Sequence, residues 1–335
     1  MSIEHNATEP AAPDIDGSAC HGGYRHEALF YGSRSEFLSG TLAFIHEALA
    51  TDEAILVVVD ETKIGQLRHE LNGDADRVLF ADMAHVGSNP ARIIQAWQDF
   101  LDEHARADNR LWGIGEPIWA GRSAAELAEC QRHEELLNVV FSDPEFSLLC
   151  PYDTGALDPA VIDRARRSHP FVREAGALRT STSYQGAAAL SAPFDDPLPD
   201  PPGTPAVFIF QVGGLRETRS WVAARAEAAG LPAERTADLL LAVNEIATNS
   251  LTHGGGGGTV SVWRQDATVV CELRDGGQIS DPLVGRRRPA EGAVGGRGLW
   301  IANQVCELVQ VRTFATGTAV RLHMHVGPVG PTVPR

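Results

Sequence analysis

A carboxylate and a carboxamide stand four residues apart in the segment LLLAVNEIATNSLTH, residues 239–253. Its apolar residues recur at helical spacing, so we expect a single amphipathic helix. On that helix Glu245 and Asn249 point to the same side, one turn apart. An amide oxygen is a hard ligand that suits Mg²⁺, and a carboxylate can accept the proton of an attacking hydroxyl. Such a pair on its own is more typical of a solvated helix face, so its meaning depends on the rest of the chain.

Three further segments carry groups that suit a nucleotide. A predicted strand ends in Asp275 and two glycines, and that carboxylate can accept a hydrogen bond from the exocyclic amine of adenine while the glycines admit the base. Residues 295–299 (GGRGL) open a helix whose first backbone N–H groups can hold phosphate oxygens. Thr318 begins the last strand, and its hydroxyl can bridge to the adenine. The four pieces together predict a nucleotide and Mg²⁺ site.

The elements that must position these residues follow residue 205. We expect strands at 206–211, 259–264, 267–274, 307–314 and 318–326, with helices at 215–229 and 232–252 and one starting at 298. Helices early and hairpins late predict an α+β layer, with the helices on one face of a mainly antiparallel sheet.

Residues 206–328 resemble the ATP-binding (Bergerat, GHKL or HATPase_c) fold shared by gyrase, heat-shock protein ninety, histidine kinases and MutL. The N box would be 245–249, the first glycine box 275–277 and the second 296–298. Within that superfamily the segment is most similar to the anti-sigma-factor serine kinases.

The resemblance implies that ATP and Mg²⁺ bind between the helices and the sheet. Glu245 would be the base that activates a serine of a small antagonist protein, Asn249 would hold Mg²⁺, and Asp275 would bind adenine. The remaining nucleotide contacts are expected at His253, Gly277, Gly296, Arg297, Gly298, Leu299 and Thr318. His253 would either line the site or, as we favour, cap its helix ahead of a flexible exit at 254–258.

The segment departs from the family in two places. Ile279 stands where many relatives have a second glycine, which predicts a different turn on the adenine side. The expected lid, 280–294, contains three adjacent arginines, 286–288. They would contact the γ-phosphate, contact an acidic partner, or form only a solvated lid.

The first part of the chain alternates short apolar runs with helical patterns. We expect strands at 28–31, 54–60, 77–81, 111–115 and 146–151, with helices at 35–50, 62–71, 90–107 and 123–140. The run AILVVVD is apolar at nearly every position, as in a strand buried on both faces of a parallel sheet. This alternation predicts right-handed βαβ units and an α/β sandwich.

Residues 24–185 resemble the MEDS sensory domain of methanogen and methylotroph regulators. The matching strings are HEALFY at 26–31, the buried strand at 54–60, GEPIWA at 115–120 and LCPYD at 149–153. The resemblance implies a RecA-like sandwich that has lost its nucleotide chemistry. In agreement, no P-loop motif follows any strand, and Lys63 is the only lysine of the chain.

Ligands of open α/β sheets collect beyond the carboxyl ends of the strands. We therefore expect either a small-molecule sensory pocket or ordinary core and edge positions at six residues: Tyr31, Glu116, Trp119, Cys150, Tyr152 and Asp153. His26 and Cys150 are not expected to bind a metal, because two ligands without spacing support make a poor site.

Composition and charge exclude several classes of protein. The chain has 335 residues and a net charge of −16; residues 1–200 carry −18 and the remainder +2, which argues against nucleic-acid binding. No apolar run reaches the length of a membrane span, and no secretory signal opens the chain. The five scattered cysteines indicate reduced thiols in a cytoplasmic protein. We expect a disordered leader at 1–23 and a proline-rich linker at 186–205.

Together, these features predict a cytoplasmic switch in which a sensory domain, with or without a small-molecule ligand, controls an anti-sigma-type serine kinase. Its partners would be a sigma factor, a STAS-type antagonist, or both, and dimerisation is expected by analogy. One alternative is a non-catalytic, nucleotide-gated module that sequesters a sigma factor. Another is a histidine kinase using His133, although the string HEEL at 133–136 is more typical of a surface helix and the linker is too rich in proline for a dimerisation hairpin.

Overall fold

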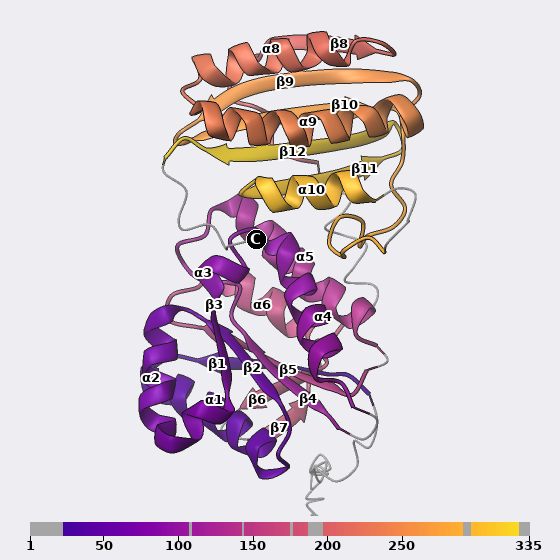
Figure 1. The fold of residues 1–335 in the computed structure, drawn as a ribbon. Coiled ribbons are helices and arrows are strands. Elements are labelled where there is room, and N and C mark those ends of the chain that lie inside the picture. The colour runs from indigo at the N-terminus through magenta and orange to yellow at the C-terminus, as the bar shows by residue number, and fades with distance from the viewer. Residues whose placement is uncertain are drawn as a thin grey trace, which may run out of the picture.

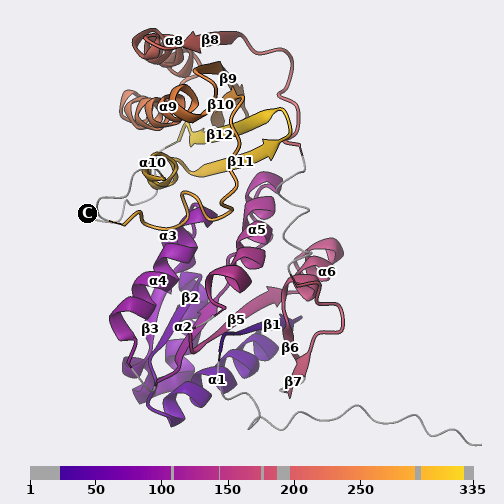
Figure 2. The same ribbon diagram turned by 90° about the vertical axis from the view of Figure 1, so that its right-hand side faces the viewer.

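The computed structural model describes residues 23–106, 109–142, 144–174, 177–186, 197–290 and 296–327. Residues 1–22 of the expected leader, 187–196 in the first part of the expected linker, 291–294 of the expected lid and Gly295 of the expected phosphate loop lie outside these ranges. The described chain forms two sheets, each with its own hydrophobic core (Figures 1 and 2). We call the seven-stranded sheet with its helices the front domain and the five-stranded sheet with its helices the rear domain.

The front domain is an α/β sandwich, as expected. Its strands are β1 (Arg25–Tyr31), β2 (Ile55–Val59), β3 (Leu79–Asp82), β4 (Leu111–Gly115), β5 (Phe146–Asp153), β6 (Phe171–Glu174) and β7 (Ala177–Thr180). Its helices are α1 (Arg34–Ala50), α2 (Glu61–Leu71), α3 (Met83–Val86), α4 (Ile93–His104), α5 (Ala124–Val140) and α6 (Pro159–Ser168), with 3₁₀ turns at Asn72–Arg77 and Pro90–Arg92. The strand order is β3-β2-β4-β5-β1-β6-β7, parallel except for β7. The closer likeness to RecA stays a prediction.

Local sequence explains where these helices begin. Ser33 and Asp60 accept hydrogen bonds from the backbone N–H three residues on, at the starts of α1 and α2. Ser123 and Glu126 form a reciprocal capping box at the start of α5. Helices α3 and α6 and strands β6 and β7, all short elements of four to ten residues, were not predicted from the sequence.

The rear domain has the predicted α+β arrangement. Its strands are β8 (Val207–Gln211), β9 (Gly257–Gln265), β10 (Thr268–Asp275), β11 (Leu308–Phe314) and β12 (Gly317–His325); its helices are α8 (Leu215–Ala228), α9 (Ala233–His253) and α10 (Arg297–Val305). The sheet is wholly antiparallel, in the order β11-β12-β10-β9-β8. All three helices cover one of its faces (Figure 2). Their buried residues and the inward side of the sheet form a single core.

The two domains are in contact. Helix α10 and strand β11 of the rear domain face α3 and α5 of the front domain in both views (Figures 1 and 2). Asn89, just before the turn at Pro90–Arg92, donates to the backbone oxygens of Asn303 and Cys306 at 3.1 and 3.2 Å. Arg132 of α5 donates to the backbone oxygen of Val311 in β11 at 2.8 Å. These buried hydrogen bonds fix how the domains meet.

Candidate nucleotide site and its contacts with the front domain

Helices α9 and α10 bring the predicted phosphate loop against the predicted catalytic pair. A Cβ placed on Gly298 would lie 3.0 Å from Asn249 Nδ2 and 3.3 Å from Glu245 Oε2, so a larger residue would require one of these side chains to shift. Gly296 precedes α10 with a φ of +76°, in the left-handed region that favours glycine. The first N–H groups of α10 have no intrahelical acceptor and lie beside Glu245 and Asn249. Backbone N–H groups that can donate hydrogen bonds to an anion therefore lie next to a carboxylate and a carboxamide.

Asp275 lies at the end of β10, next to the last turn of α9. Its two carboxylate oxygens accept from the Ser250 hydroxyl at 2.6 Å and from the Gly277 N–H at 2.7 Å. A Cβ on Gly254 would lie 2.6 Å from the Asp275 carboxyl carbon, and one on Gly277 would lie 2.8 Å from the His253 backbone oxygen. The carboxylate is thus held in one orientation by glycines that leave no room for side chains.

Thr318 belongs to the same cluster. Strand β12 pairs with β10 so that Thr318 lies opposite Asp275, and its hydroxyl donates to the Gly277 backbone oxygen at 2.9 Å. That hydroxyl also lies 3.3 Å from the hydroxyl of Thr313. The sequence reasoning placed Asp275, Gly277 and Thr318 together, and in the structure they are neighbours.

The other expected contacts differ in exposure. Leu299 is buried in the rear core, so its side chain packs while its backbone N–H belongs to the first turn of α10. The side chain of Arg297 is exposed at the start of α10. His253 is exposed and does not cap α9; instead the Gly254 N–H donates to the Ser250 oxygen at 2.9 Å. The expected flexible exit is also shorter, because strand β9 already begins at Gly257.

The expected lid is anchored to the front domain at its first half. Leu283 is buried in the core of the front domain, among residues of α4, α5 and β5. Gly285 lies so close to α10 that a Cβ there would be 2.7 Å from Leu299 Cβ, and its backbone oxygen accepts from Asn303 Nδ2 at 3.0 Å. Residues 283–286 are therefore held between the two domains. We call them the anchor segment.

Arg286 of the anchor segment contacts an acidic group of the same chain. Its Nη2 lies 2.8 Å from Glu129 Oε2, and Nη1 of Arg312 lies 2.8 Å from Glu129 Oε1. Burial raises the pKa of Glu129, but Arg132, Arg312 and Arg286 outweigh it and hold that pKa below its ordinary value. Arg286 is therefore paired within the chain, whereas Arg287 and Arg288 have exposed side chains and Nη2 of Arg288 lies 3.6 Å from Asp99 Oδ2 of α4. The contacts of the arginine run with the γ-phosphate or with an acidic partner stay predictions. The sequence alone could not pair Arg286 with a residue 157 positions earlier.

Helix α5 is buried, contrary to the expectation of a surface helix. Charged and polar residues from Glu129 to Glu135 are enclosed along with its apolar ones. His133 is 1% exposed, and burial lowers its pKa to about 3. A phosphoacceptor side chain must be accessible to the γ-phosphate of a bound nucleotide, so the burial of His133 argues against that role.

The six residues expected to form a sensory pocket lie on both sides of the front sheet. Tyr31 donates to Glu116 Oε1 at 2.6 Å, and Lys63 Nζ lies 2.6 Å from Glu116 Oε2, on the side covered by α1 and α2. Burial, followed by the charge of Glu116, raises the pKa of Tyr31 further above its ordinary value. Burial also raises the pKa of Glu116, despite the ammonium of Lys63.

The remaining candidates are elsewhere. Cys150 and Tyr152 are buried on the other side of the sheet, in the core shared with α4, α5 and α6. Trp119 stacks under the guanidinium of Arg122 at 3.7 Å, and Asp153 accepts from the N–H groups of Gly155 and Ala156 in the loop after β5. The structure therefore brings Tyr31 and Glu116 together but does not gather all six residues.

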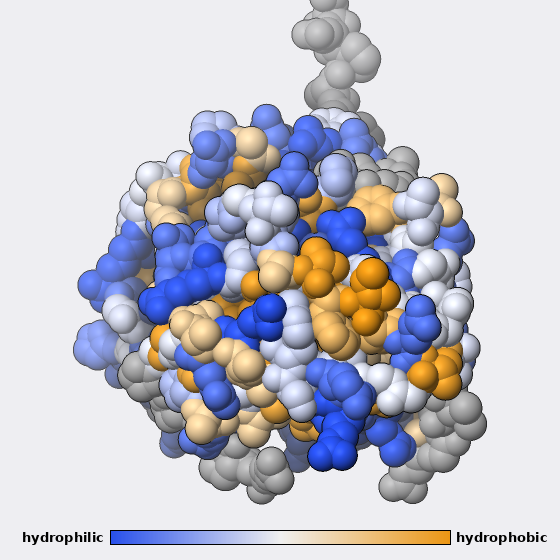
Figure 3. All heavy atoms as spheres, turned by 90° about the horizontal axis from the view of Figure 1, so that it is seen from above, coloured by the Kyte–Doolittle hydropathy of each residue, from blue (hydrophilic) through white to orange (hydrophobic). Residues whose placement is uncertain are grey.

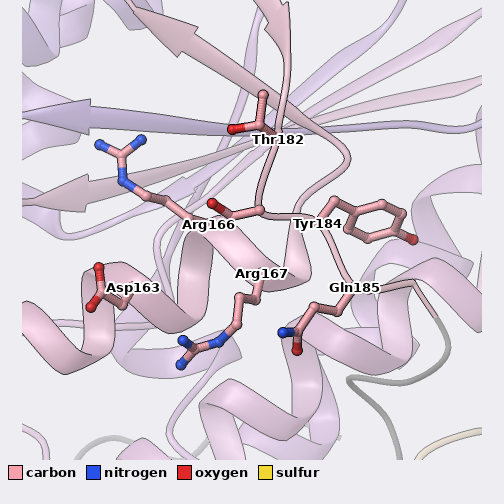
Figure 4. Close-up of a pocket in the computed structure, with 7 residues that line it drawn as sticks. Asp163, Arg166, Arg167, Thr182, Tyr184 and Gln185 are labelled. Carbon is pink, nitrogen blue, oxygen red and sulfur yellow. The ribbon is translucent and has the colours of Figure 1, made fainter.

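A hollow of about 460 Å³ lies at a different place in the front domain (Figure 4). Asp163, Arg166 and Arg167 of α6 line it, together with residues 182–185 of the following loop. Arg166 and Arg167 point to opposite sides in the close-up. The hollow includes none of the six residues expected to form a pocket.

The described helices do not include one with the length and apolarity needed to cross a bilayer. The four cysteines in the described ranges, at 130, 150, 271 and 306, are unpaired and buried.

Comparisons with known proteins agree with the two-part organisation. No curated protein matches the chain. Among solved structures, the crystal structure of the RsbU and RsbW domains of Rv1364c from Mycobacterium tuberculosis is 18% identical over 38% of this chain and 35% of that one, with a TM-score of 0.29. The chain thus spans about a third of that structure. The histidine kinase AdeS of Acinetobacter baumannii is 11% identical over 37% of this chain and 70% of that one, with a TM-score of 0.24. Scores this low carry no argument about shape or function.

The family matches are more informative. Residues 25–170 match MEDS, the methanogen/methylotroph, DcmR sensory domain. Residues 210–324 match the histidine kinase-like ATPase domain. The first match covers the front sheet as far as α6, and the second runs from the last residues of β8 nearly to the end of β12. The chain therefore joins a MEDS sensory domain to a histidine kinase-like ATPase domain.

Proposed function

We propose that the protein is an ATP-dependent regulatory kinase that transfers phosphate to a serine of an anti-sigma-factor antagonist, under the control of its MEDS domain. The observation that carries this proposal is the contact of Gly298 with Glu245 and Asn249, which places helix N–H donors beside a carboxylate and a carboxamide. The partners would be a STAS-type antagonist, a sigma factor, or both.

The residues present fit ATP and Mg²⁺. The N-terminus of α10 offers unpaired N–H groups to phosphate oxygens, and the Asn249 side chain offers an amide oxygen to the metal ion. Asp275 already accepts one hydrogen bond on each oxygen, and a carboxylate oxygen has a further lone pair with which to accept from an adenine amine. When bound, Mg²⁺ neutralises phosphate charge. Glu245 would take the proton of the attacking serine hydroxyl.

Control by the MEDS domain would act through the anchor segment. Leu283 and Arg286 connect the stretch between the glycine boxes to the front domain rather than to the nucleotide site. A shift of α5 would therefore move the loop that leads into the phosphate-binding end of α10. A small-molecule ligand of the MEDS domain would act by producing that shift.

The test is phosphate transfer by the full chain. Purified protein would be incubated with γ-labelled ATP, Mg²⁺ and a panel of purified STAS-type antagonists, with Glu245→Gln as the variant and Glu234→Gln as its matched control, since Glu234 is an exposed residue of the same helix. We expect acid-stable label on an antagonist serine, lost in Glu245→Gln and retained in Glu234→Gln.

Two results would redirect the proposal. Nucleotide binding without transfer to any antagonist would favour the alternative of a non-catalytic, nucleotide-gated module that sequesters a sigma factor. Acid-labile label on the protein itself would favour the histidine-kinase alternative, for which the burial of His133 leaves no accessible acceptor at that position.

We further propose that two copies pair along β8, the edge strand of the rear sheet. Val207 and Ile209 are 58% and 69% exposed, while Phe210 on the other side of the strand is buried. Figure 3 shows apolar side chains gathered on the face that carries α8 and β8. An antiparallel edge is self-complementary and can pair with its own copy. Light scattering should detect a dimer of the wild-type protein, and Ile209→Lys should dissociate it. The control is Leu79→Lys, at an exposed position on the edge strand β3, which should leave the dimer intact. A wild-type protein that is monomeric at the same concentration would disprove pairing.

A further inference from the structure

Four side chains with metal-binding atoms meet inside the front domain. They are His26 of β1, Glu134 of α5, Cys150 of β5 and His169, the residue that follows α6. One ligand atom from each lies within 4.8 Å of those of the other three. His26, Glu134, Cys150 and His169 are all buried, at 0–1% exposed. We call these four residues the His-Cys-Glu cluster.

Hydrogen bonds on the outer side of each imidazole aim its other nitrogen into the cluster. Asn138 donates its Nδ2 to the Ser168 oxygen at 2.8 Å, so its Oδ1, 3.1 Å from His26 Nδ1, accepts the proton of that nitrogen. His169 Nδ1 lies 2.8 Å from the Ala165 backbone oxygen, which can only accept. Both rings therefore carry their proton on Nδ1 and present the lone pair of Nε2 inward. A partner on the far nitrogen is the usual support of a metal-bound histidine.

Inside the cluster, Cys150 Sγ and His26 Nε2 lie within hydrogen-bond distance, at 3.3 Å, but the carboxylate lacks such a bond in the described part of the chain. The two oxygens of Glu134 have no hydrogen-bond partner among the described residues, and the same is true of His169 Nε2. Instead, Glu134 Oε2 lies 3.3 Å from Nε2 of both histidines, so lone pairs face a carboxylate. Burial of a charged group without a partner costs several kcal/mol unless a cation or a proton compensates.

Three ligand-atom distances inside the cluster match those of a tetrahedral metal centre, and all of its ligand atoms lie within 4.8 Å of one another. Bonds of about 2.1 Å at tetrahedral angles place neighbouring ligand atoms about 3.4 Å apart. His26 Nε2 lies 3.3 Å from both Cys150 Sγ and Glu134 Oε2.

We infer that the His-Cys-Glu cluster is a binding site for one divalent transition-metal ion, with Zn²⁺ as the ion that its two nitrogens, one sulfur and one oxygen suit best. A closed set of four protein ligands, with none of the ligating residues exposed, is typical of a structural centre. On binding, the S–H bond of Cys150 breaks, its proton leaves to solvent and a metal–sulfur bond forms. The inference does not depend on the proposed kinase activity.

Sequence reasoning rejected a metal here because it considered only His26 and Cys150. The missing ligands, Glu134 and His169, stand in a helix and at a helix end with no motif linking them to the other two. The fold brings them together because β1 lies between β5 and β6, while α5 packs on that side of the sheet.

The test is metal content followed by a spectroscopic probe of the sulfur ligand. The full chain, purified from medium containing zinc and without an affinity tag that binds metals, should retain about one Zn²⁺ per chain by mass spectrometry. After replacement by Co²⁺, an intense thiolate-to-cobalt charge-transfer band is expected. Cys150→Ser should lose that band, whereas Cys130→Ser should keep it, because Cys130 is a buried cysteine of the same domain that only donates to the Pro117 oxygen.

A second variant keeps the test decisive if Cys150→Ser does not fold. Asn138→Ala leaves all four ligands in place and removes the support of His26 together with the hydrogen bond to the Ser168 oxygen, so it should weaken Co²⁺ binding roughly 10–100-fold. The inference fails if folded wild-type protein neither retains zinc nor shows the charge-transfer band on Co²⁺ titration. It also fails if Cys150→Ser retains that band.

Discussion

Glu129 of the MEDS domain and Arg286 of the ATPase domain form a buried ion pair at 2.8 Å. Arg312 of β11 approaches the other oxygen of the same carboxylate at 2.8 Å. Arg132 of α5 also lies near this carboxylate, at 3.9 Å, so Glu129 is shared between arginines of both domains, and its contact with Arg286 holds the anchor segment against the front domain. Helix α5 of the MEDS domain thus contacts both the anchor segment and β11 of the ATPase domain.

Loss of the carboxylate should destabilise the protein and free the anchor segment. Glu129→Gln leaves buried guanidinium groups without their counter-charge, which typically costs about 3–5 kcal/mol. We expect that decrease in the free energy of unfolding by urea titration, together with faster tryptic cleavage at the exposed Arg287 and Arg288. Glu103→Gln, at an exposed position on α4, is the control. Equal stability and equal cleavage in both variants would show that the ion pair does not hold the segment.

The close contact at Gly298 should determine nucleotide affinity. In Gly298→Ala the new methyl group would meet Asn249 at 3.0 Å and displace it or the helix. Overpacking of this kind costs about 1–3 kcal/mol, and if that cost falls on the bound state it corresponds to roughly 5- to 150-fold loss of affinity. Calorimetry with ATP and Mg²⁺ measures it. Gly65→Ala, in helix α2 with open space around it, should instead leave affinity unchanged and slightly stabilise the protein.

Helices α9 and α5 show how much of the structure could be predicted from the sequence. The proximity of the predicted nucleotide-site residues could be predicted because the polar pair on α9, Asp275 and the glycines before α10 follow one another in an order that resembles a known family. The burial of helix α5 could not be predicted, because Glu129, His133 and Glu134 have the composition of a solvated face. Their partners come from β1, β11, the end of α6 and the anchor segment, and only the assembled fold brings these together.

Acid should destabilise the rear domain through His323. Burial, followed by the charge of Arg321, lowers the pKa of His323 to about 4, while the unfolded chain takes up the proton near pH 6.5. Between these values the unfolded state binds more protons, so stability is unaffected above about pH 6.5, falls by up to about 1.4 kcal/mol per pH unit on acidification, and levels off below about pH 4.

The measurement is urea unfolding across that pH range. His323→Gln should flatten the slope by close to one proton, while His325→Gln, with an exposed side chain on the same strand, should leave it unchanged. If the slope of His323→Gln equals that of the wild-type protein, the neutral form of His323 does not contribute to this pH dependence.

Removal of the metal from the His-Cys-Glu cluster should act in two places. An ion bound only by the folded state at about 1,000 times its dissociation constant adds roughly 4 kcal/mol, so chelation under mildly denaturing conditions should lower the melting temperature of the front domain. Glu134 and Glu129 belong to the same helix, five positions apart, and release of the first from the metal loosens the helix that holds Arg286. Stripped protein should therefore also be cleaved faster by trypsin at Arg287 and Arg288, and zinc should reverse both effects in wild-type protein and Cys130→Ser but not in Cys150→Ser. A lower melting temperature with unchanged cleavage would mean that the metal stabilises the MEDS fold without positioning the anchor segment.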